Sequence, residues 1–168
     1  SYRRDNWSLT QPPSFFWGDF TFKRRSVMNR ATTEFVSRQR IGHLATADRS
    51  GNSVVVPICF ANGENDVLYT PLDSKPKSVA PNKLKRLANI DENPSVSVVF
   101  DTYSEDWNKL AYVITFGEAA LLTDADERNR AENLLRDKYP QYETYLSVGA
   151  PIIRIKISRS KSWGLVSN

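Results

Sequence analysis

The chain has 168 residues, a net charge of +4, and apolar and charged fractions of 40% and 25%. This length is typical of one domain with a sizeable core, and the modest charge does not indicate a nucleic-acid binder. The single cysteine, Cys59, excludes an internal disulfide and a cysteine-based metal cluster. A single cysteine fits a reducing compartment, so we expect a cytoplasmic protein. No run reaches the roughly twenty apolar residues that cross a bilayer, so we expect no membrane contact.

The first 28 residues are expected to be an extension in front of a single domain at 29–168. They interleave aromatic rings with arginine and lysine, and Pro12 and Pro13 interrupt any helix. Such a segment can stack on single-stranded nucleic acid. Burial of its rings against its own domain or a partner subunit is the favoured interpretation, and nucleic acid is a disfavoured partner.

The first half of the domain is expected to hold one helix and three strands. Asn29 or Thr32 can cap the helix, which runs to Arg40. Turn signals separate the β-rich runs that follow, which predicts an antiparallel meander. The runs are Ile41 to Asp48, Ser53 to Ala61 and Asp66 to Asp73.

The second of these runs is apolar on both faces, over Val54, Val55, Val56, Pro57 and Ile58. One face is therefore expected to meet the core and the other a partner or a ligand. Because Pro57 cannot donate to a strand ladder, it indicates a sheet edge or a bulge.

The stretch from Tyr69 to Pro94 has the outline of a phosphate receptor. A loop with Ser74, Lys75 and Lys77 follows the strand that ends near Thr70, and a basic helix comes next. Ammonium groups supply positive charge, hydroxyls supply donors, and the helix start adds free N–H groups. The alternative is a solvated basic loop without a ligand.

The second half is expected to alternate helices with strands, and Gly117 is a candidate bulge. The expected elements are a helix from Asn82 to Glu92, strands from Ser95 to Thr102 and from Leu110 to Leu122, a helix from Asp124 to Tyr139, and a strand from Pro151 to Ser158. A capping box at 124–127 is expected to begin the second helix, and its inward-facing side is expected to consist of Ala131, Leu134, Leu135 and the stem of Lys138. Six strands with short helices between them predict an α+β, barrel-like domain.

The sequence is poor in acid–base chemistry. His43 and Cys59 lack the neighbours that a catalytic triad or a zinc site needs, and we interpret both as packing residues. Neither a GxGxxG nor a GxxxxGK[ST] motif is present. A chain equipped for phosphate but poor in acid–base groups suits a cofactor that carries its own reactivity.

Five segments, taken in order, carry a family resemblance. They are IGHLATADRSGNSVVVPICFA at 41–61, LYTPLDSKPK at 68–77, LKRLANIDENPSVSVVFD at 84–101, EDWNKLAYVITFGEA at 105–119 and KYPQY at 138–142. Together they resemble the pyridoxamine 5'-phosphate oxidase-like split-barrel flavoproteins, especially the branch of coenzyme F-420-dependent (deazaflavin) oxidoreductases. The resemblance implies a homodimer of six-stranded antiparallel split β-barrels with short flanking helices. It also implies FMN, or alternatively coenzyme F-420, at the subunit interface.

The resemblance also implies which residues hold the cofactor. The run Val54, Val55, Val56 and Pro57 would line the isoalloxazine through backbone groups, Tyr69 and Thr70 match a strand end that contacts the cofactor, and Ser74, Lys75 and Lys77 match its phosphate loop. Trp107 and Tyr112 are candidates to pack on the ring system, or else in the core or a dimer interface. The stretch from Lys138 to Tyr142 is a candidate for the substrate mouth.

The implied activity is transfer of a hydride or electrons between the cofactor and a small conjugated substrate. Oxidation of pyridoxamine phosphate itself is disfavoured, because Cys59 stands where the oxidase has a lysine on FMN and the oxidase's C-terminal Arg-and-His motif is absent. The alternative is a non-catalytic flavin or tetrapyrrole binding protein that stores, delivers or senses its ligand, since a split barrel need not be an enzyme. No catalytic residue is assigned.

Overall fold

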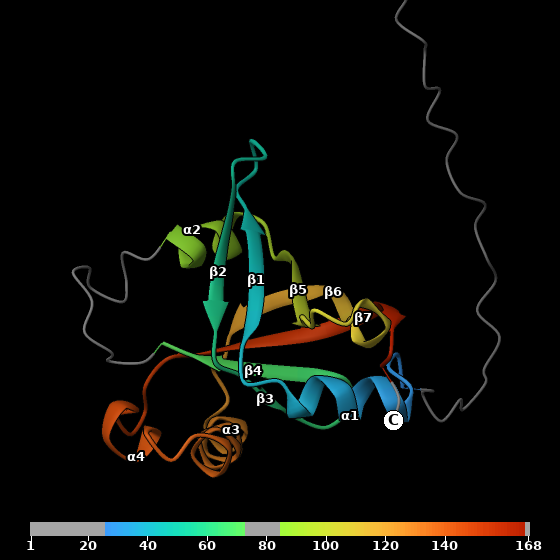
Figure 1. Cartoon of the computed structure of the whole chain (residues 1–168). Helices are drawn as coiled ribbons and strands as arrows, with labels where there is room; N and C mark the ends of the chain where they lie inside the picture. The colour runs from blue at the N-terminus through green and yellow to red at the C-terminus, as the bar shows by residue number, and fades with distance from the viewer. Residues whose placement is uncertain (1–25, 73–84, 167–168) are drawn as a thin grey trace, which may run out of the picture.

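One curled sheet forms the body of the molecule in a computed structural model that describes residues 26–72 and 85–166 (Figure 1). Its strands are β1 Gly42–Ala47, β2 Ser53–Ile58, β3 Ala61–Asn62, β4 Val67–Pro71, β5 Ser95–Thr102, β6 Ala111–Leu121 and β7 Ile152–Gly164. The helices are α1 Arg30–Arg38, α2 Lys85–Glu92, α3 Ala125–Lys138 and α4 Tyr142–Tyr145, with a 3-10 turn, η2, at Trp107–Lys109. All strand pairs are antiparallel, in the order β2-β1-β5-β6-β7-β4-β3. The α+β split-barrel prediction is confirmed, and the short β3 raises the strand count from six to seven.

The predicted meander of the first three strands is wrong. β1 and β2 form a hairpin, but β4 pairs with β7 near the other end of the sheet. The chain crosses between the two edges at Cys59 and Phe60. Phe60 is completely buried, and its N–H donates to the hydroxyl of Tyr139 rather than to a neighbouring strand. The predicted edge position of Pro57 is confirmed, because β2 is the first strand of the sheet.

Two apolar clusters stabilise this arrangement. The main core fills the inside of the curled sheet with alternate side chains of its strands, among them Leu44, Phe60, Leu68, Val98, Phe100, Val113 and Ile155. The second cluster lies between α3, α4 and the outer surface of β4 and β7, with Tyr69, Ala131, Leu135, Tyr139, Tyr142 and Ile152. Asp124 caps α3 as predicted, because its carboxylate accepts from the N–H of Glu127 at 2.7 Å. Leu134 was expected to face inward but is 38% exposed.

A bulge joins the two longest strands. The register between β6 and β7 shifts at Phe116 and Gly117, which confirms the bulge predicted at Gly117. A Cβ atom on Gly117 would overlap the carbonyl oxygen of Lys156. Beyond the bulge, β7 continues six residues past the predicted end at Ser158, and these residues are mostly polar and show no apolar alternation. This extension places Trp163 opposite Tyr112.

Asp66 ties the segment before α1 to the turn between β3 and β4. Its carboxylate accepts hydrogen bonds from the Ser26 hydroxyl at 2.6 Å and from the N–H groups of Val27 and Met28 at 2.9 and 3.2 Å. Burial by itself would raise the pKa of Asp66, but these hydrogen bonds and the charge of Lys156 bring it below its ordinary value. The ionised carboxylate therefore stabilises the folded protein.

We expect Asp66→Asn to lower the free energy of unfolding by about 1 kcal/mol at pH 7. Asparagine keeps the shape and tolerates the left-handed backbone at this position (φ 58°), so the lost charge is the main change. Because the folded-state pKa is depressed, the difference should be complete above about pH 4 and shrink as the pH falls through the folded-state pKa. Urea titrations at pH 7 and pH 3 measure the difference in the free energy of unfolding. Asp91→Asn, at an exposed position, is the control. An Asp66→Asn effect of equal size at both pH values would contradict the assignment.

Candidate functional site

Outward-pointing side chains of β2, β1, β5, β6 and the second half of β7 form one exposed surface, here named the open face. Directly paired residues point to the same side of a sheet, and so do alternate residues along each strand. The open face consists of three cross-strand rows: Val55, Ala45, Ser97, Phe116 and Arg159; Pro57, His43, Val99, Ile114 and Lys161; and Asp101, Tyr112 and Trp163. Val55 is 63%, Trp163 53% and Tyr112 37% exposed. The surface is therefore largely apolar and accessible to solvent in the single chain.

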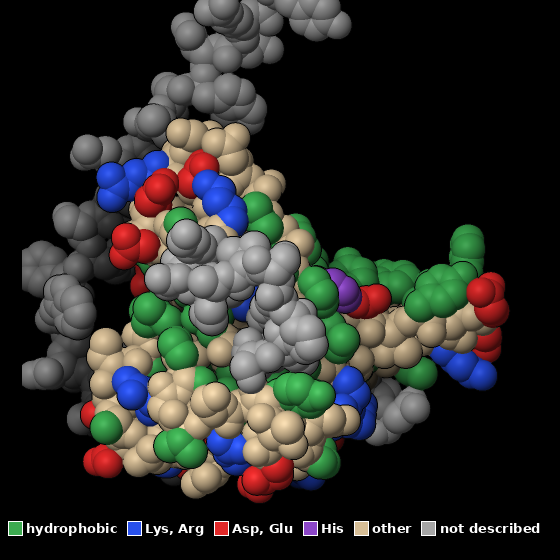
Figure 2. Space-filling view, turned by 90° about the vertical axis from the view of Figure 1, so that its left-hand side faces the viewer, with side chains coloured by type: hydrophobic (Ala, Val, Ile, Leu, Met, Phe, Trp, Pro, Cys, Tyr) green, Lys and Arg blue, Asp and Glu red, His purple; other side chains and the backbone are tan. Residues whose placement is uncertain are grey.

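Aromatic and ionisable groups are paired on this surface. Tyr112 stacks on Trp163 with ring centroids 5.7 Å apart. His43 Nδ1 lies 3.7 Å from Asp101 Oδ1, and Figure 2 shows the imidazole with a carboxylate beside it and hydrophobic side chains on either side. The interpretation of His43 as a packing residue is wrong. Its neighbour Leu44 is completely buried, and because side chains alternate along a strand, His43 points outward. The signal in the sequence is the apolar Leu44 next to His43 in a predicted strand.

The structure gathers part of the predicted cofactor site on the open face. Val55 and Pro57 point outward from β2, whereas Val54 and Val56 alternate with them and are half-buried. Tyr112 belongs to the same surface. Trp107 lies in η2, just before β6, and is 72% exposed. These positions leave the proposed ring contacts accessible.

Tyr69 and Thr70 are placed differently. Both are buried in β4, at 7% and 2% exposure. The Tyr69 hydroxyl donates to Glu127 Oε1 on α3 at 2.7 Å. Burial, followed by the hydrogen bond to this carboxylate, raises the pKa of Tyr69 to about 12. Its hydroxyl therefore serves the contact with α3 and does not point to the open face. The predicted phosphate contacts Ser74, Lys75 and Lys77 lie outside the described residues.

The stretch from Lys138 to Tyr142 was predicted to shape a substrate mouth, but it belongs mainly to the second cluster. Tyr139 and Tyr142 are 6% and 1% exposed, and the Tyr139 hydroxyl contacts the backbone of Arg40 and Phe60. The Lys138 ammonium lies 3.6 Å from the centroid of the Phe60 ring. Burial, and then the charge of Arg40, lowers the pKa of Lys138 to about 8. These residues therefore stabilise the fold around the crossover at Phe60.

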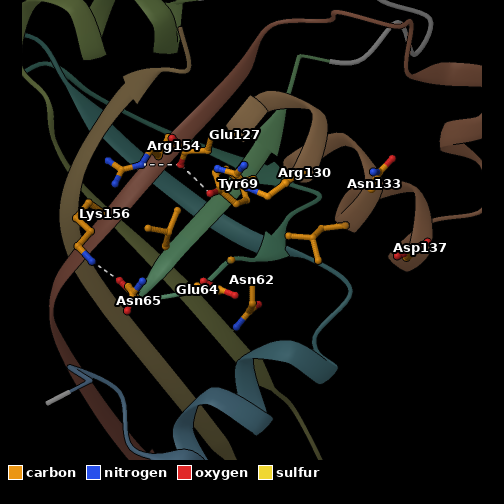
Figure 3. A pocket seen from close by; sticks show the side chains of 13 residues that line it. Asn62, Glu64, Asn65, Tyr69, Glu127, Arg130, Asn133, Asp137, Arg154 and Lys156 are labelled. Carbon is orange, nitrogen blue, oxygen red and sulfur yellow. Dashed lines mark hydrogen bonds and ion pairs between the residues drawn. The ribbon is translucent and has the colours of Figure 1, made fainter. Parts of the chain in front are cut away.

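A pocket of about 630 Å³ lies beneath α3 and is here named the α3 pocket (Figure 3). It is bounded by the turn between β3 and β4, by β4 and β7, and by one side of α3. Its lining residues are Asn62, Gly63, Glu64, Asn65, Val67, Tyr69, Glu127, Arg130, Asn133, Leu134, Asp137, Arg154 and Lys156. Arg154 Nε donates to Glu127 Oε1 at 3.0 Å, on the oxygen that Tyr69 also contacts. Nothing in the sequence patterns pointed to this pocket, because its residues come from three separate segments of the chain.

Two further features are absent from the part of the chain that the structure describes. No group of three or more histidine, cysteine, aspartate or glutamate side chains there is arranged to hold a metal ion. No helix there has the length and hydropathy to cross a membrane.

Comparison with known proteins places the chain among split-barrel proteins. The family described as Pyridoxamine 5'-phosphate oxidase matches residues 28–163. No curated protein matches the sequence.

Solved structures share the fold over most of their length. A FAD-binding protein from Mesorhizobium loti is 25% identical with a TM-score of 0.60, over 82% of this chain and 95% of that one. A conserved hypothetical protein from Mycobacterium tuberculosis is 19% identical with a TM-score of 0.64, over 86% and 90%. A heme storage protein from Vibrio cholerae is 13% identical with a TM-score of 0.62, over 80% and 94%. The last two likenesses concern the fold alone.

Proposed function

Because the chain belongs to the pyridoxamine 5'-phosphate oxidase family, we propose that it binds a flavin at the open face of a homodimer and exchanges a hydride or electrons with a small conjugated substrate. FMN is the first candidate and coenzyme F-420 the alternative. The observation that carries the proposal is the exposed apolar surface next to the edge strand β2. The likeness to a FAD-binding protein supports a flavin-type cofactor.

The residues of β2 fit a flat conjugated ring. Val55 and Pro57 offer apolar contact on the open face. β2 is the first strand of the described sheet, so on its outer side alternate backbone N–H and C=O groups point away from β1. These groups can bond the polar edge of an isoalloxazine or deazaflavin ring. The ring would thus be held by backbone polarity and apolar packing together.

A second copy of the chain is the proposed partner of the open face. Val55, Tyr112 and Trp163 expose large apolar side chains on one surface, and contiguous apolar patches of this kind mark interaction sites. A two-fold dimer would cover the patch with its own equivalent. Such a dimer would also exclude water from a ring bound beside β2.

The bound flavin would supply the redox chemistry, and the chain would position it and manage protons. His43 is the single histidine of the chain, and it lies in the middle row of the open face, between Pro57 and Val99. The Asp101 carboxylate lies beside its Nδ1 and can orient the ring. His43 Nε2 is therefore our candidate to hold or release a proton during turnover.

The second candidate function is non-catalytic binding of a flavin or a tetrapyrrole. An exposed histidine on an apolar surface also suits an iron tetrapyrrole, because imidazole is a common axial ligand of heme iron. The shared fold of the Vibrio cholerae heme storage protein is compatible with this role.

The absorbance spectrum and mass analysis of the protein, purified from a host that makes FMN, coenzyme F-420 and heme, test both functions. Released FMN or F-420, with turnover against a panel of acceptors, would support the oxidoreductase. A bound flavin without turnover, or a heme band that His43→Ala shifts, would support the storage or sensing role. A protein that stays colourless after addition of each cofactor would exclude both.

Lys75→Ala and Lys77→Ala are each expected to weaken FMN binding at least tenfold. A charge-assisted hydrogen bond to phosphate contributes about 1.5–3 kcal/mol, and about 1.4 kcal/mol is a factor of ten. Flavin fluorescence titration measures the affinity. Lys85→Ala is the matched control, because Lys85 pairs with Asp48 at 3.3 Å instead. Unchanged FMN affinity in both test variants would remove these lysines from the proposed site.

A further inference from the structure

We propose that the α3 pocket binds a small organic monocarboxylate, with the carboxylate held between Arg130 of α3 and Arg154 of β7. Among the described residues that are proposed for the cofactor, only Tyr69 also lines this pocket. The pocket volume of about 630 Å³ is in the range of small-molecule sites. The inference is therefore independent of the proposed flavin function.

The two guanidinium groups offer donors that the described residues do not use. Arg154 Nε donates a hydrogen bond to Glu127, and the two terminal nitrogens of Arg154 have no acceptor among residues 26–72 and 85–166. Arg130 forms no hydrogen bond or ion pair within the same residues. Arg154 Nε lies 3.0 Å from the Glu127 oxygen that the Tyr69 hydroxyl also contacts, and Arg130 lines the same pocket. Figure 3 shows Arg130, Arg154 and Tyr69 at the same end of the pocket.

This end of the pocket is pre-organised. Glu127 Oε1 accepts from both the Tyr69 hydroxyl at 2.7 Å and Arg154 Nε at 3.0 Å, which holds Arg154 in place. A planar guanidinium fixed in this way presents its remaining donors as a fork that matches a carboxylate. A ligand would therefore lose little further side-chain entropy at Arg154 on binding.

The charge distribution favours a monoanion. Three cations line the pocket, Arg130, Arg154 and Lys156, and three carboxylates balance them, so the lining as a whole has no excess positive charge. Two of these carboxylates belong to Glu64 and Asp137, and Asp137 lies seven residues after Arg130, about 10 Å along α3. These carboxylates would repel a phosphate dianion. Val67 and Leu134 supply apolar wall for an organic body, which selects a small carboxylate over an inorganic anion.

The test is a titration of the ¹⁵N-labelled full chain with benzoate and, separately, with inorganic phosphate, in a buffer whose only other anion is chloride. We expect benzoate to shift amide signals of 62–67, 127–137 and 154–156, and to bind more tightly than phosphate. Arg130→Gln should raise the benzoate Kd at least tenfold. Leu134→Glu, at a 38% exposed position, should abolish binding and preserve the fold. Arg38→Gln removes the same charge from an exposed site on α1 and should change nothing.

Three results would overturn the proposal. They are the absence of benzoate shifts in these segments, phosphate binding as tight as benzoate binding, or equal benzoate affinity in Arg130→Gln and Arg38→Gln. Flavin affinity measured on the same variants separates this site from the cofactor site, because Arg130→Gln should leave it unchanged.

Discussion

Gly117→Ala is expected to lower the free energy of unfolding by about 3 kcal/mol or more, among the largest effects of a single methyl group. The added Cβ would overlap the carbonyl oxygen of Lys156 and lie 3.0 Å from the Cα of Ile157. Both neighbours are backbone atoms of β7, so no side-chain rotation relieves the overlap. The bulge would have to open, and β6 and β7 share the longest ladder in the sheet. Urea denaturation followed by circular dichroism measures the loss.

Gly149→Ala is the matched control for this substitution. Gly149 has a left-handed backbone (φ 74°), and a Cβ there would meet no atom within 4 Å. Its cost should be only the backbone strain of alanine, about 1 kcal/mol. If Gly117→Ala were no more destabilising than Gly149→Ala, the close approach at the bulge would be refuted.

Val55→Lys is expected to raise the dissociation constant of the proposed dimer at least 100-fold and to release the proposed flavin with it. Val55 is 63% exposed in the first row of the open face. In a two-fold interface both subunits would carry the new ammonium group, and each group would lose its water without gaining an ionic partner. Such buried unpaired charges cost about 2–5 kcal/mol. Light scattering after size-exclusion chromatography, with the bound flavin absorbance recorded on the same peak, measures both consequences.

The control for Val55→Lys is Val148→Lys. Val148 is 92% exposed, and it lies between α4 and β7, away from the open face. It should leave both mass and flavin content unchanged. A Val55→Lys protein that stays dimeric would move the interface elsewhere, whereas a monomer that keeps its flavin would separate cofactor binding from dimerisation.

Local patterns were sufficient to predict most elements of this fold. Ser95 to Thr102 is rich in β-branched residues, and its predicted bounds coincide with β5. Asp124 was predicted and found as the cap of α3. Strand pairing was harder, because the partner of β4 depends on how Phe60 is buried and not on turns nearby. The polar end of β7 is fixed by its ladder with β6, a contact that has no local signal.

The candidate site was predictable where strand parity decides it. Val55 and Pro57 point to the open face, as expected for an apolar strand whose two sides meet different surroundings. Tyr69 departs from the expectation, because its hydroxyl bonds Glu127, a residue 58 positions away. The α3 pocket has the same origin, because Arg130 and Arg154 line one pocket only after α3 packs on the sheet.

The buried hydroxyl of Tyr139 has a consequence for the order of folding. It accepts from the N–H of Phe60 at 3.1 Å, 79 positions away, and lies 2.8 Å from the carbonyl oxygen of Arg40, 99 positions away. Contacts this distant in sequence close large loops and form slowly. The crossover at Phe60 is therefore protected only once α3 has docked. Its amide hydrogen exchange reports the opening of that helix from the sheet, without any probe on α3 itself.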